Sequence, residues 1–363
     1  MNLHFIFSIP TAILGFALLP AISAMALAPR PAAESPVKIR LSDNGDFMVP
    51  LLAQGLGYFQ QEGLEMIRVK IADVAPTDFQ MQEPLNKGRI DASFHWFQHT
   101  IFGVRHNYPV KAVIMLSDAP GLKIMVANRV KDQIKSAADF KGRNVAEGMG
   151  YAAKSMLTNY LAQKAGLPSR SYTSVFPETA GRFEAVTKGL NEGKVDIVSF
   201  MEPLSSAILA TNKVSTLYDM TTREGTVKAL GAPLPAISIL MAPSYIEAHP
   251  EIVQRLVNVF VRTMRYINTH NADEIAAKLP ATYFTSKDRQ AEIDFLRNTL
   301  PNYARGDYSF TPDAVQMAID TIRSSSFDKS EEGVWRATVE NPHVIPEQLY
   351  TNEFVEKAMR EIR

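Results

Sequence analysis

One pattern occurs twice in this chain, as L-N-K-G-R-I-D at residues 85–91 and as L-N-E-G-K-V-D at residues 190–196. In each copy a glycine follows a stretch with helical character, where a residue with positive φ is favoured. An acid and a short apolar run come next, at residues 92–94 and 197–200. Each copy therefore predicts a helix that stops at its glycine and a strand that follows.

The similarity extends upstream of both copies. E-G-L at residues 62–64 and A-G-L at residues 165–167 precede them at almost the same offset, and short predicted strands lie earlier still, at 38–42 and 143–147. A β-loop-α-β-α-β module of roughly a hundred residues is thus repeated. The carboxyl ends of parallel strands share one edge, where ligands bind. Two such modules facing each other predict a cleft.

Length and composition restrict the function. A chain of 363 residues exceeds what one core usually supports, so two lobes are expected. The formal net charge is zero and no long basic run is present, which argues against nucleic acid as a partner. Cysteine is absent, which excludes disulfides, thiolate metal sites, iron–sulfur clusters and a cysteine nucleophile.

The first 28 residues have the features of a signal peptide. They contain no Asp, Glu, Lys or Arg, and A-L-A at residues 26–28 is a small-x-small cleavage pattern. We expect cleavage near Ala28, a flexible leader at 29–36 and a mature monomer in the periplasm without stable membrane insertion. A retained membrane anchor is the alternative, although no later stretch approaches the roughly 20 apolar residues of a span.

The repeats predict how the chain is divided. We expect a first lobe at 37–125 and 238–363, a second lobe at 126–237, and crossover strands at 122–127 and 236–241. A single helix is predicted for about 47–60. An apolar stripe at i, i+3/i+4, i+7 predicts a helix that opens near residue 249, and the later C-terminal helices are interpreted as packing without chemistry.

The motifs provide no positive sign of catalysis, a metal or a cofactor. G-M-G-Y-A-A-K-S at residues 148–155 resembles two nucleotide-binding signatures. As a P-loop it has Ala153 in place of the second glycine, and as a dinucleotide fingerprint it lacks an acid at the spacing of a ribose contact. What remains is a tight turn, which either binds nothing or offers helix N–H groups to a polar or anionic ligand. His95 and His99 at i, i+4 lack a third metal ligand, and no G-x-S-x-G elbow is present.

Several short motifs together resemble a known family. They are G-L-G-Y-F at 55–59, E-G-L at 62–64, G-R-I-D at 88–91, I-K-S-A-A-D-F-K-G-R at 134–143 and G-K-V-D at 193–196. The set resembles the nitrate/sulfonate/taurine-type solute-binding proteins of ABC importers, which are related to the thiamine-pyrimidine synthases. The resemblance implies a type II periplasmic-binding fold, in which two α/β lobes with mainly parallel sheets are joined by two hinge strands.

The same resemblance implies a small-molecule solute and an ABC permease with its ATPase as partners. The alternative is an enzyme of the pyrimidine-synthase-like branch, although those enzymes rely on a cysteine-rich segment that this chain lacks. Sulfonate binders tend to carry small hydroxyl residues where this chain has G-Y-A-A at 150–153.

The residues that follow strand carboxyl ends form the predicted solute site. They are Asp43, Asn44, Phe47, Phe94, His95, Trp96, Ser117, Asp118, Gly148, Gly150, Tyr151 and Glu202. Glu202 followed by Pro203 can also simply begin a helix. Because acids outnumber bases among the strand-end residues, with Lys154 and Arg182 the nearest bases, a zwitterion or nitrogen heterocycle is favoured. Sulfonates such as taurine remain its rivals.

Overall fold

Two α/β halves make up the part of the chain that the computed structural model describes. The described residues are 35–43, 47–74, 81–105, 107–148, 152–169, 171–175, 182–284, 287–324 and 344–362. The predicted signal peptide and most of the predicted leader lie outside them, as do Asn44, Gly150 and Tyr151 of the predicted site.

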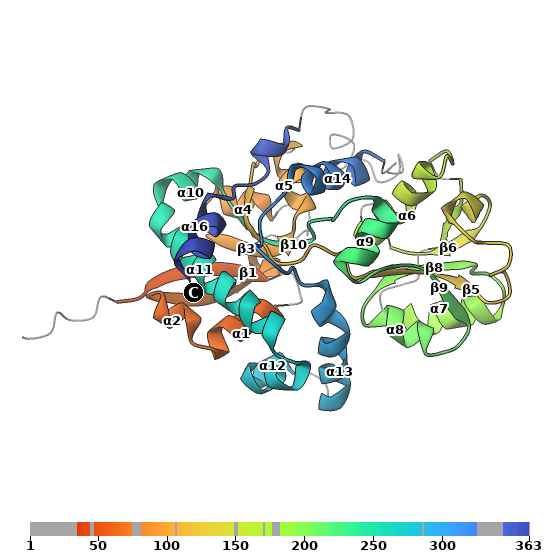
Figure 1. The fold of residues 1–363 in the computed structure, drawn as a ribbon, viewed down its shortest axis with the longest axis horizontal. Coiled ribbons are helices and arrows are strands. Elements are labelled where there is room, and N and C mark those ends of the chain that lie inside the picture. Colours follow the sequence, from red (N-terminus) through yellow and green to blue (C-terminus); the bar gives the residue numbers. More distant parts are fainter. Residues whose placement is uncertain are drawn as a thin grey trace, which may run out of the picture. The chain divides into compact units, whose positions relative to one another are not determined.

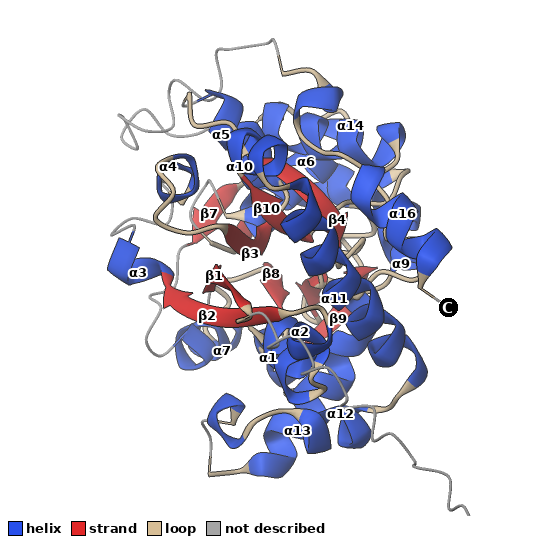
Figure 2. Ribbon diagram, turned by 90° about the vertical axis from the view of Figure 1, so that its left-hand side faces the viewer, coloured by secondary structure: helices blue, strands red, loops and turns tan. Residues whose placement is uncertain are grey.

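The first sheet has the strand order β2-β1-β3-β10-β4, which can be followed in Figure 2. Figure 1 labels β1, β3 and β10 of this sheet. Its strands are β1 (Val37–Asp43), β2 (Leu64–Lys70), β3 (Ala92–Trp96), β4 (Lys111–Met115) and β10 (Ile237–Met241). β1 is parallel to both β2 and β3, whereas β10 is antiparallel to its neighbours β3 and β4. Four strands therefore share one direction, which places the carboxyl ends of β1, β2, β3 and β4 at one edge.

The second sheet repeats this plan with the order β7-β6-β8-β5-β9. Its strands are β5 (Leu122–Ala127), β6 (Asn144–Ala146), β7 (Thr173–Val175), β8 (Ile197–Met201) and β9 (Val214–Met220). Here β5 is the antiparallel strand, between β8 and β9. The two mainly parallel sheets that the repeat predicts are confirmed.

Helices flank both sheets. They are α1 (Met48–Gly55), α2 (Tyr58–Gln61), α3 (Ile71–Val74), α4 (Gln82–Asn86), α5 (Gln98–Arg105), α6 (Ala153–Lys164), α7 (Arg182–Asn191), α8 (Leu204–Leu209), α9 (Arg223–Leu230), α10 (Pro243–Ala248), α11 (Pro250–Thr269), α12 (Ala272–Lys278), α13 (Arg289–Thr299), α14 (Pro312–Arg323) and α16 (Glu353–Glu361). Short 3₁₀ helices lie at Ala137–Phe140, Ala281–Tyr283, Leu300–Asn302 and Pro346–Gln348. In the first sheet α11 and α16 pack on β4, and in the second α6 and α8 pack on β8.

The repeated aspartate ties neighbouring strands together in the same way in both halves. A carboxylate oxygen of Asp91 accepts the backbone N–H of Arg40 at 2.7 Å, and Asp196 accepts that of Asn144 at 2.9 Å. Each carboxylate also pairs with a guanidinium, that of Arg40 at 2.5 Å or that of Arg129 at 2.6 Å. The repeat thus encodes one structural device, because each carboxylate satisfies a backbone donor where a strand pair begins.

Glycines end the helices as the pattern predicts. Gly88 and Gly193, the glycines of the two repeat copies, have φ of 62° and 71°, values that other residues adopt only with strain. The prediction of a single helix for residues 47–60 is wrong, because the helix is broken towards its C-terminal end. Gly57 has φ of 73°, and this left-handed residue separates α1 from α2.

The chain passes between the sheets just before β5 and just before β10. Residues 122–125, predicted for the first lobe, pair with strands of the second sheet, whereas β10 pairs entirely within the first. Each predicted crossover strand is therefore a full member of the sheet that it enters. The exact lobe boundaries stay a prediction.

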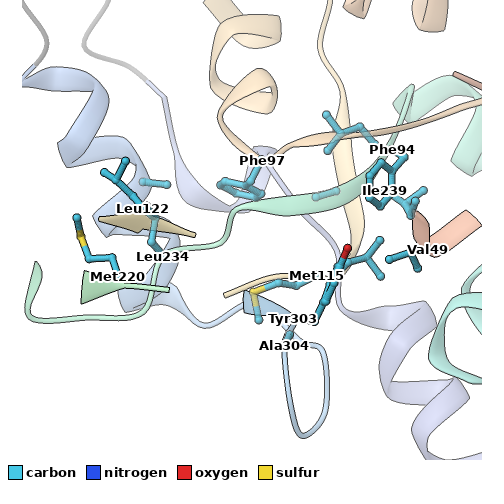
Figure 3. Close-up of a cluster of buried hydrophobic side chains, with 14 of the residues drawn as sticks. Val49, Phe94, Phe97, Met115, Leu122, Met220, Leu234, Ile239, Tyr303 and Ala304 are labelled. Atoms are coloured by element: carbon cyan, nitrogen blue, oxygen red, sulfur yellow. The ribbon is translucent and has the colours of Figure 1, made fainter. Parts of the chain in front are cut away.

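Buried hydrophobic side chains form one connected cluster that includes residues of both sheets. Figure 3 shows part of it, with Phe94 and Ile239 from the first sheet and Leu122 and Met220 from the second. None of the helices in the described residues is both long and apolar enough to cross a membrane.

Candidate ligand-binding site

A cavity of about 230 Å³ lies where ends of strands from both sheets meet the two chain crossings. Phe94 and Trp96 of β3 line it from the first sheet, and Met201 and Glu202, at the end of β8, line it from the second. The carboxyl ends of parallel strands are where α/β proteins place ligands, and the cavity occupies that position with respect to both sheets.

The C-terminal helices complete the wall. Phe295 of α13 and Asn302 of the following 3₁₀ helix line the cavity. The interpretation of these helices as packing alone is therefore incomplete. The sequence did not indicate their contribution to the wall, because it depends on how the chain returns to the first sheet. The Oδ1 atom of Asn302 is buried and has no hydrogen-bond partner among the described residues.

Four of the predicted site residues line this cavity: Phe94, Trp96, Ser117 and Glu202. Their role in binding a solute remains a prediction. The Ser117 hydroxyl lies 2.6 Å from the carbonyl oxygen of Asn302 and 2.7 Å from that of Ala119. Ser117 thus links the first crossing to the C-terminal helices.

Phe47 and His95 do not line the cavity. Phe47 is buried and packs edge-on against Phe94, with ring centres 6.0 Å apart. The Arg68 guanidinium lies 4.9 Å from the Phe47 ring centre. Phe47 therefore lies behind the cavity wall and supports Phe94.

His95 points to the opposite face of β3 from Phe94 and Trp96, as strand alternation requires. Its ring centre is 4.0 Å from that of His99, and its Nδ1 accepts the Trp96 N–H at 2.8 Å. Burial, reinforced by His99, lowers the pKa of His95 well below its ordinary value. The described residues contain no group of three His, Cys, Asp or Glu side chains placed to hold a metal.

Asp118 and Glu202 are both paired within the protein. Asp118 is buried and bonds the Arg223 guanidinium at 2.8 Å. Glu202 bonds the Lys123 ammonium at 2.5 Å and accepts the Ser206 hydroxyl at 2.8 Å. Burial opposes ionisation of Glu202, but the hydrogen bonds from Lys123 and Ser206 keep its pKa below the ordinary value.

These ion pairs remove a premise of the sequence argument, which treated the two carboxylates as available to ligand donors. The missed partners are Lys123 and Arg223. Lys123 has a detectable signal, because it is the one charged residue in the apolar strand L-K-I-M-V-A of β5. Arg223 has none, since it begins a helix more than a hundred residues from its partner.

At the second sheet, the ends of β6 and β8 bring a lysine and a buried carboxyl together. The Lys154 ammonium lies 4.8 Å from the ring centre of Phe200, and the Arg182 guanidinium lies 5.7 Å from it. Burial and the nearby guanidinium lower the pKa of Lys154 to about 8. Gly148, a predicted site residue, faces the same lysine, and a Cβ there would lie 2.2 Å from Cε of Lys154.

Glu147 lies beside this lysine at the end of β6. It is 3% exposed and accepts hydrogen bonds from the hydroxyls of Ser174 at 2.6 Å and Tyr172 at 3.5 Å. Burial nevertheless raises the pKa of Glu147 to about 8, because removal of the ionised form from water costs more than the hydrogen bonds return. Of the remaining predicted residues, Asp43 ends β1, and its side chain is outside the described part.

Solved structures resemble this fold. A periplasmic sulfonate-binding protein of Methylobacillus flagellatus has 13% sequence identity and a TM-score of 0.67, over 91% of this chain and 96% of that protein. The alkanesulfonate-binding protein of Xanthomonas axonopodis pv. citri, bound to MOPS, has 16% identity and a TM-score of 0.59, over 88% and 100%. The desulfurization enzyme DSZB has 14% identity and a TM-score of 0.57, over 90% and 100%.

These likenesses confirm the periplasmic-binding-protein fold, which supports both binding proteins and an enzyme. No curated protein matches the sequence. The family model described as NMT1/THI5 like matches residues 44–273, well over half of the chain. On this match, the chain belongs to the NMT1/THI5-like family.

Proposed function

We propose that this protein is the extracytoplasmic solute-binding component of an ABC importer. It captures a small organic solute between its two sheets and delivers it to a permease with its ATPase. The observation that carries the proposal is the cavity lined from both sheets, with Phe94 and Trp96 on one side and Met201 and Glu202 on the other. A ligand that touches both sides stabilises the closed arrangement of the two halves over an open one.

The two chain crossings supply the hinge in this proposal. They are short segments next to β5 and β10, and a few such residues can absorb the backbone rotation of domain closure. Residues 1–28 direct export, the mature chain acts in the periplasm as a monomer, and the permease recognises the closed form.

Sulfonates are the first class of solute to test, because two proteins of this fold are named as sulfonate binders. A nitrogen heterocycle or zwitterion is the second. It is favoured by the aromatic face of Trp96 at the cavity wall, on which a flat or cationic group can stack. Activity of an enzyme on a small heterocycle is the alternative function, since DSZB shows that the fold also supports catalysis.

Native mass spectrometry of freshly purified protein tests the proposal directly, because a tightly held solute is carried through purification. Calorimetry with taurine, alkanesulfonates, nitrate and aminopyrimidines then measures the affinities. We expect one class to bind, Trp96→Ala to weaken it at least tenfold, and Ile345→Ala, at a position 54% exposed, to leave it unchanged.

Small-angle scattering measures closure. The radius of gyration of the wild-type protein should fall at saturating solute. Turnover of a bound compound would support the enzyme instead, and binding without any compaction would contradict delivery by closure.

A further inference from the structure

Helix α14 contacts both halves of the protein. It packs on α5, which follows strand β3 of the first half, and on α6 of the second half, and Figure 1 shows it between these two helices. Its inner face is apolar, and Val315, Ile319 and Ile322 are buried there. This helix of 12 residues therefore joins the halves at a place other than the two chain crossings.

The start of α14 is fixed to the first half. The backbone N–H of Met115, at the end of β4, donates to the carbonyl oxygen of Tyr308 at 3.1 Å. The backbone N–H and carbonyl oxygen of Phe310 both bond the side-chain amide of Asn352, each at 2.9 Å. The Phe310 ring packs on that of Phe97, with ring centres 5.3 Å apart. The start of α14 should therefore move with the first sheet.

The end of α14 is held by the second half instead. The carbonyl oxygen of Ser324, the residue that follows the helix, accepts the side-chain amides of Asn159 and Gln163, each at 2.5 Å. Both donors belong to α6, and Asn159 is buried. The last carbonyl groups of a helix have no partner within the helix, so donors from another element satisfy this one. Side chains of α6 thus cap the end of α14.

The middle of α14 adjoins the wall of the cavity. Ala318 and Thr321 line a small pocket together with Trp96, which also lines the cavity. Met156 of α6 and Pro235, in the crossing that precedes β10, line the same small pocket. The contact of α14 with α6 and the proposed solute site therefore share Trp96 as a neighbour.

Rotation about the crossings, which the proposed function requires, cannot keep both ends of α14 in place. Separation of the ends of β3 and β8 would move α6 away from α5, and a hydrogen-bonded helix does not lengthen to follow both. Release of the end frees two amides and one carbonyl group, which water can satisfy. Release of the start would also break a backbone hydrogen bond and the contact between Phe310 and Phe97. The end at Ser324 is therefore the attachment that opens.

We propose that α14 is a latch between the two halves, closed by the hydrogen bonds of Asn159 and Gln163 to Ser324. The inference rests on the proposed solute-binding function and adds a device that regulates the affinity of the same site. The latch bonds form only when α6 is close to α5, so they stabilise the closed arrangement and not the open one. Apparent affinity rises with the fraction of protein that is competent to bind. The latch thus strengthens binding without touching the solute.

Calorimetry on variants measures the contribution of the latch. The probes are taurine, methanesulfonate, nitrate and an aminopyrimidine, and the one that binds the wild type most tightly is used with every variant. Asn159→Leu should weaken binding roughly three- to tenfold, which is the net effect of one hydrogen bond. Its combination with Gln163→Leu should weaken binding further.

Gln254→Leu is the matched control. The Gln254 amide donates to the carbonyl oxygen of Phe354 at 3.0 Å, a buried contact between α11 and α16, which both belong to the first half. Its loss should lower the stability in urea and leave the affinity unchanged, because it connects no element of one half to the other.

The absence of cysteine from the chain allows a second test that needs no solute. Gln163→Cys and Ser324→Cys introduce two thiols, which a short bismaleimide can join. In small-angle scattering, the joined protein should have a smaller radius of gyration than the same protein with both thiols capped by N-ethylmaleimide. Addition of the probe should compact the capped protein and leave the joined protein unchanged.

The outcomes distinguish the latch from the function on which it rests. Unchanged affinity of the folded double leucine variant overturns the latch and leaves solute binding intact. Equal radii of the joined and capped proteins, while the wild type compacts with the probe, do the same. A loss of affinity in Gln254→Leu as large as that in Asn159→Leu overturns it as well, since any weakened helix contact would then suffice. Failure of all four probes, with no solute carried through purification, overturns the proposed function, and the two radii still decide whether α14 holds the halves together.

Discussion

Replacement of Glu147 by glutamine should make the protein more stable, by an amount that grows with pH. The carboxyl group is buried at the end of β6 beside Lys154, and its hydrogen bonds come from Ser174 and Tyr172. Glutamine has nearly the same shape, and its carbonyl oxygen can accept the same hydroxyl groups. It cannot ionise, so it never incurs the cost of a buried negative charge.

The magnitude follows from the pKa. Burial raises the pKa of Glu147 from 4.5 to about 8, and at 1.36 kcal/mol for each pH unit this shift corresponds to roughly 4–5 kcal/mol. Because the folded-state pKa is the higher one, the carboxyl's contribution to stability is complete below pH 4.5. It is lost progressively as pH rises through about 8. The wild-type protein should lose this stability relative to the variant.

Urea denaturation at pH 5, 7 and 9 measures the effect. The difference in unfolding free energy between Glu147→Gln and wild type should grow by about 4 kcal/mol from pH 5 to pH 9. Titration of Lys154 is common to both proteins and cancels to first order in the difference. Glu224→Gln, at an exposed position of α9, provides the baseline for the same substitution. A difference in unfolding free energy between the two proteins that changes by less than 1 kcal/mol from pH 5 to pH 9 would refute the argument.

Three further substitutions test the packing around the sheets by urea denaturation. Lys123→Met should lower the free energy of unfolding by about 3–5 kcal/mol, because it leaves the buried Glu202 carboxylate without its cation. Replacement of both residues by methionine should recover most of that loss, and no recovery would contradict the pairing. Gly55→Ala should be severely destabilising, since its Cβ would lie 1.9 Å from a backbone carbonyl of α12, whereas Gly142→Ala meets open space and should cost only about 1–2 kcal/mol of backbone strain; equal costs would argue against the close approach. Asp196→Ala should cost about 1–3 kcal/mol by leaving a strand N–H without its acceptor, and a neutral result would show that water replaces the carboxylate.

The sequence by itself determined the two-fold repetition of the fold. The turn glycines are local features, because Gly88 and Gly193 adopt positive φ that few other residues tolerate. The repeated Asp91 and Asp196 then make the same backbone contact in each half. Strand alternation also places Phe94 and Trp96 on one side of β3 and His95 on the other, although the predicted site included all three. All these features depend on residues close in sequence or on a period of two.

The net charge at the candidate site depended on contacts between residues that are distant in sequence. Glu202 and Lys123 are 79 positions apart, and Asp118 and Arg223 are 105 apart, so no local pattern shows that these charges cancel. Their pairing turns an apparent excess of acids into a largely neutral edge. Lys154 keeps an ammonium without a carboxylate partner among the described residues.

The same reason explains the missed walls of the cavity. Phe295 and Asn302 lie on a C-terminal segment that the sequence presents only as amphipathic packing, and they reach the cavity because the chain returns to the first sheet after β10. Periodicity predicts which face of an element is buried, but the partner that buries it is decided by the tertiary arrangement. The repeat therefore defined two halves, and the folded chain alone decided which charges and which apolar side chains meet between them.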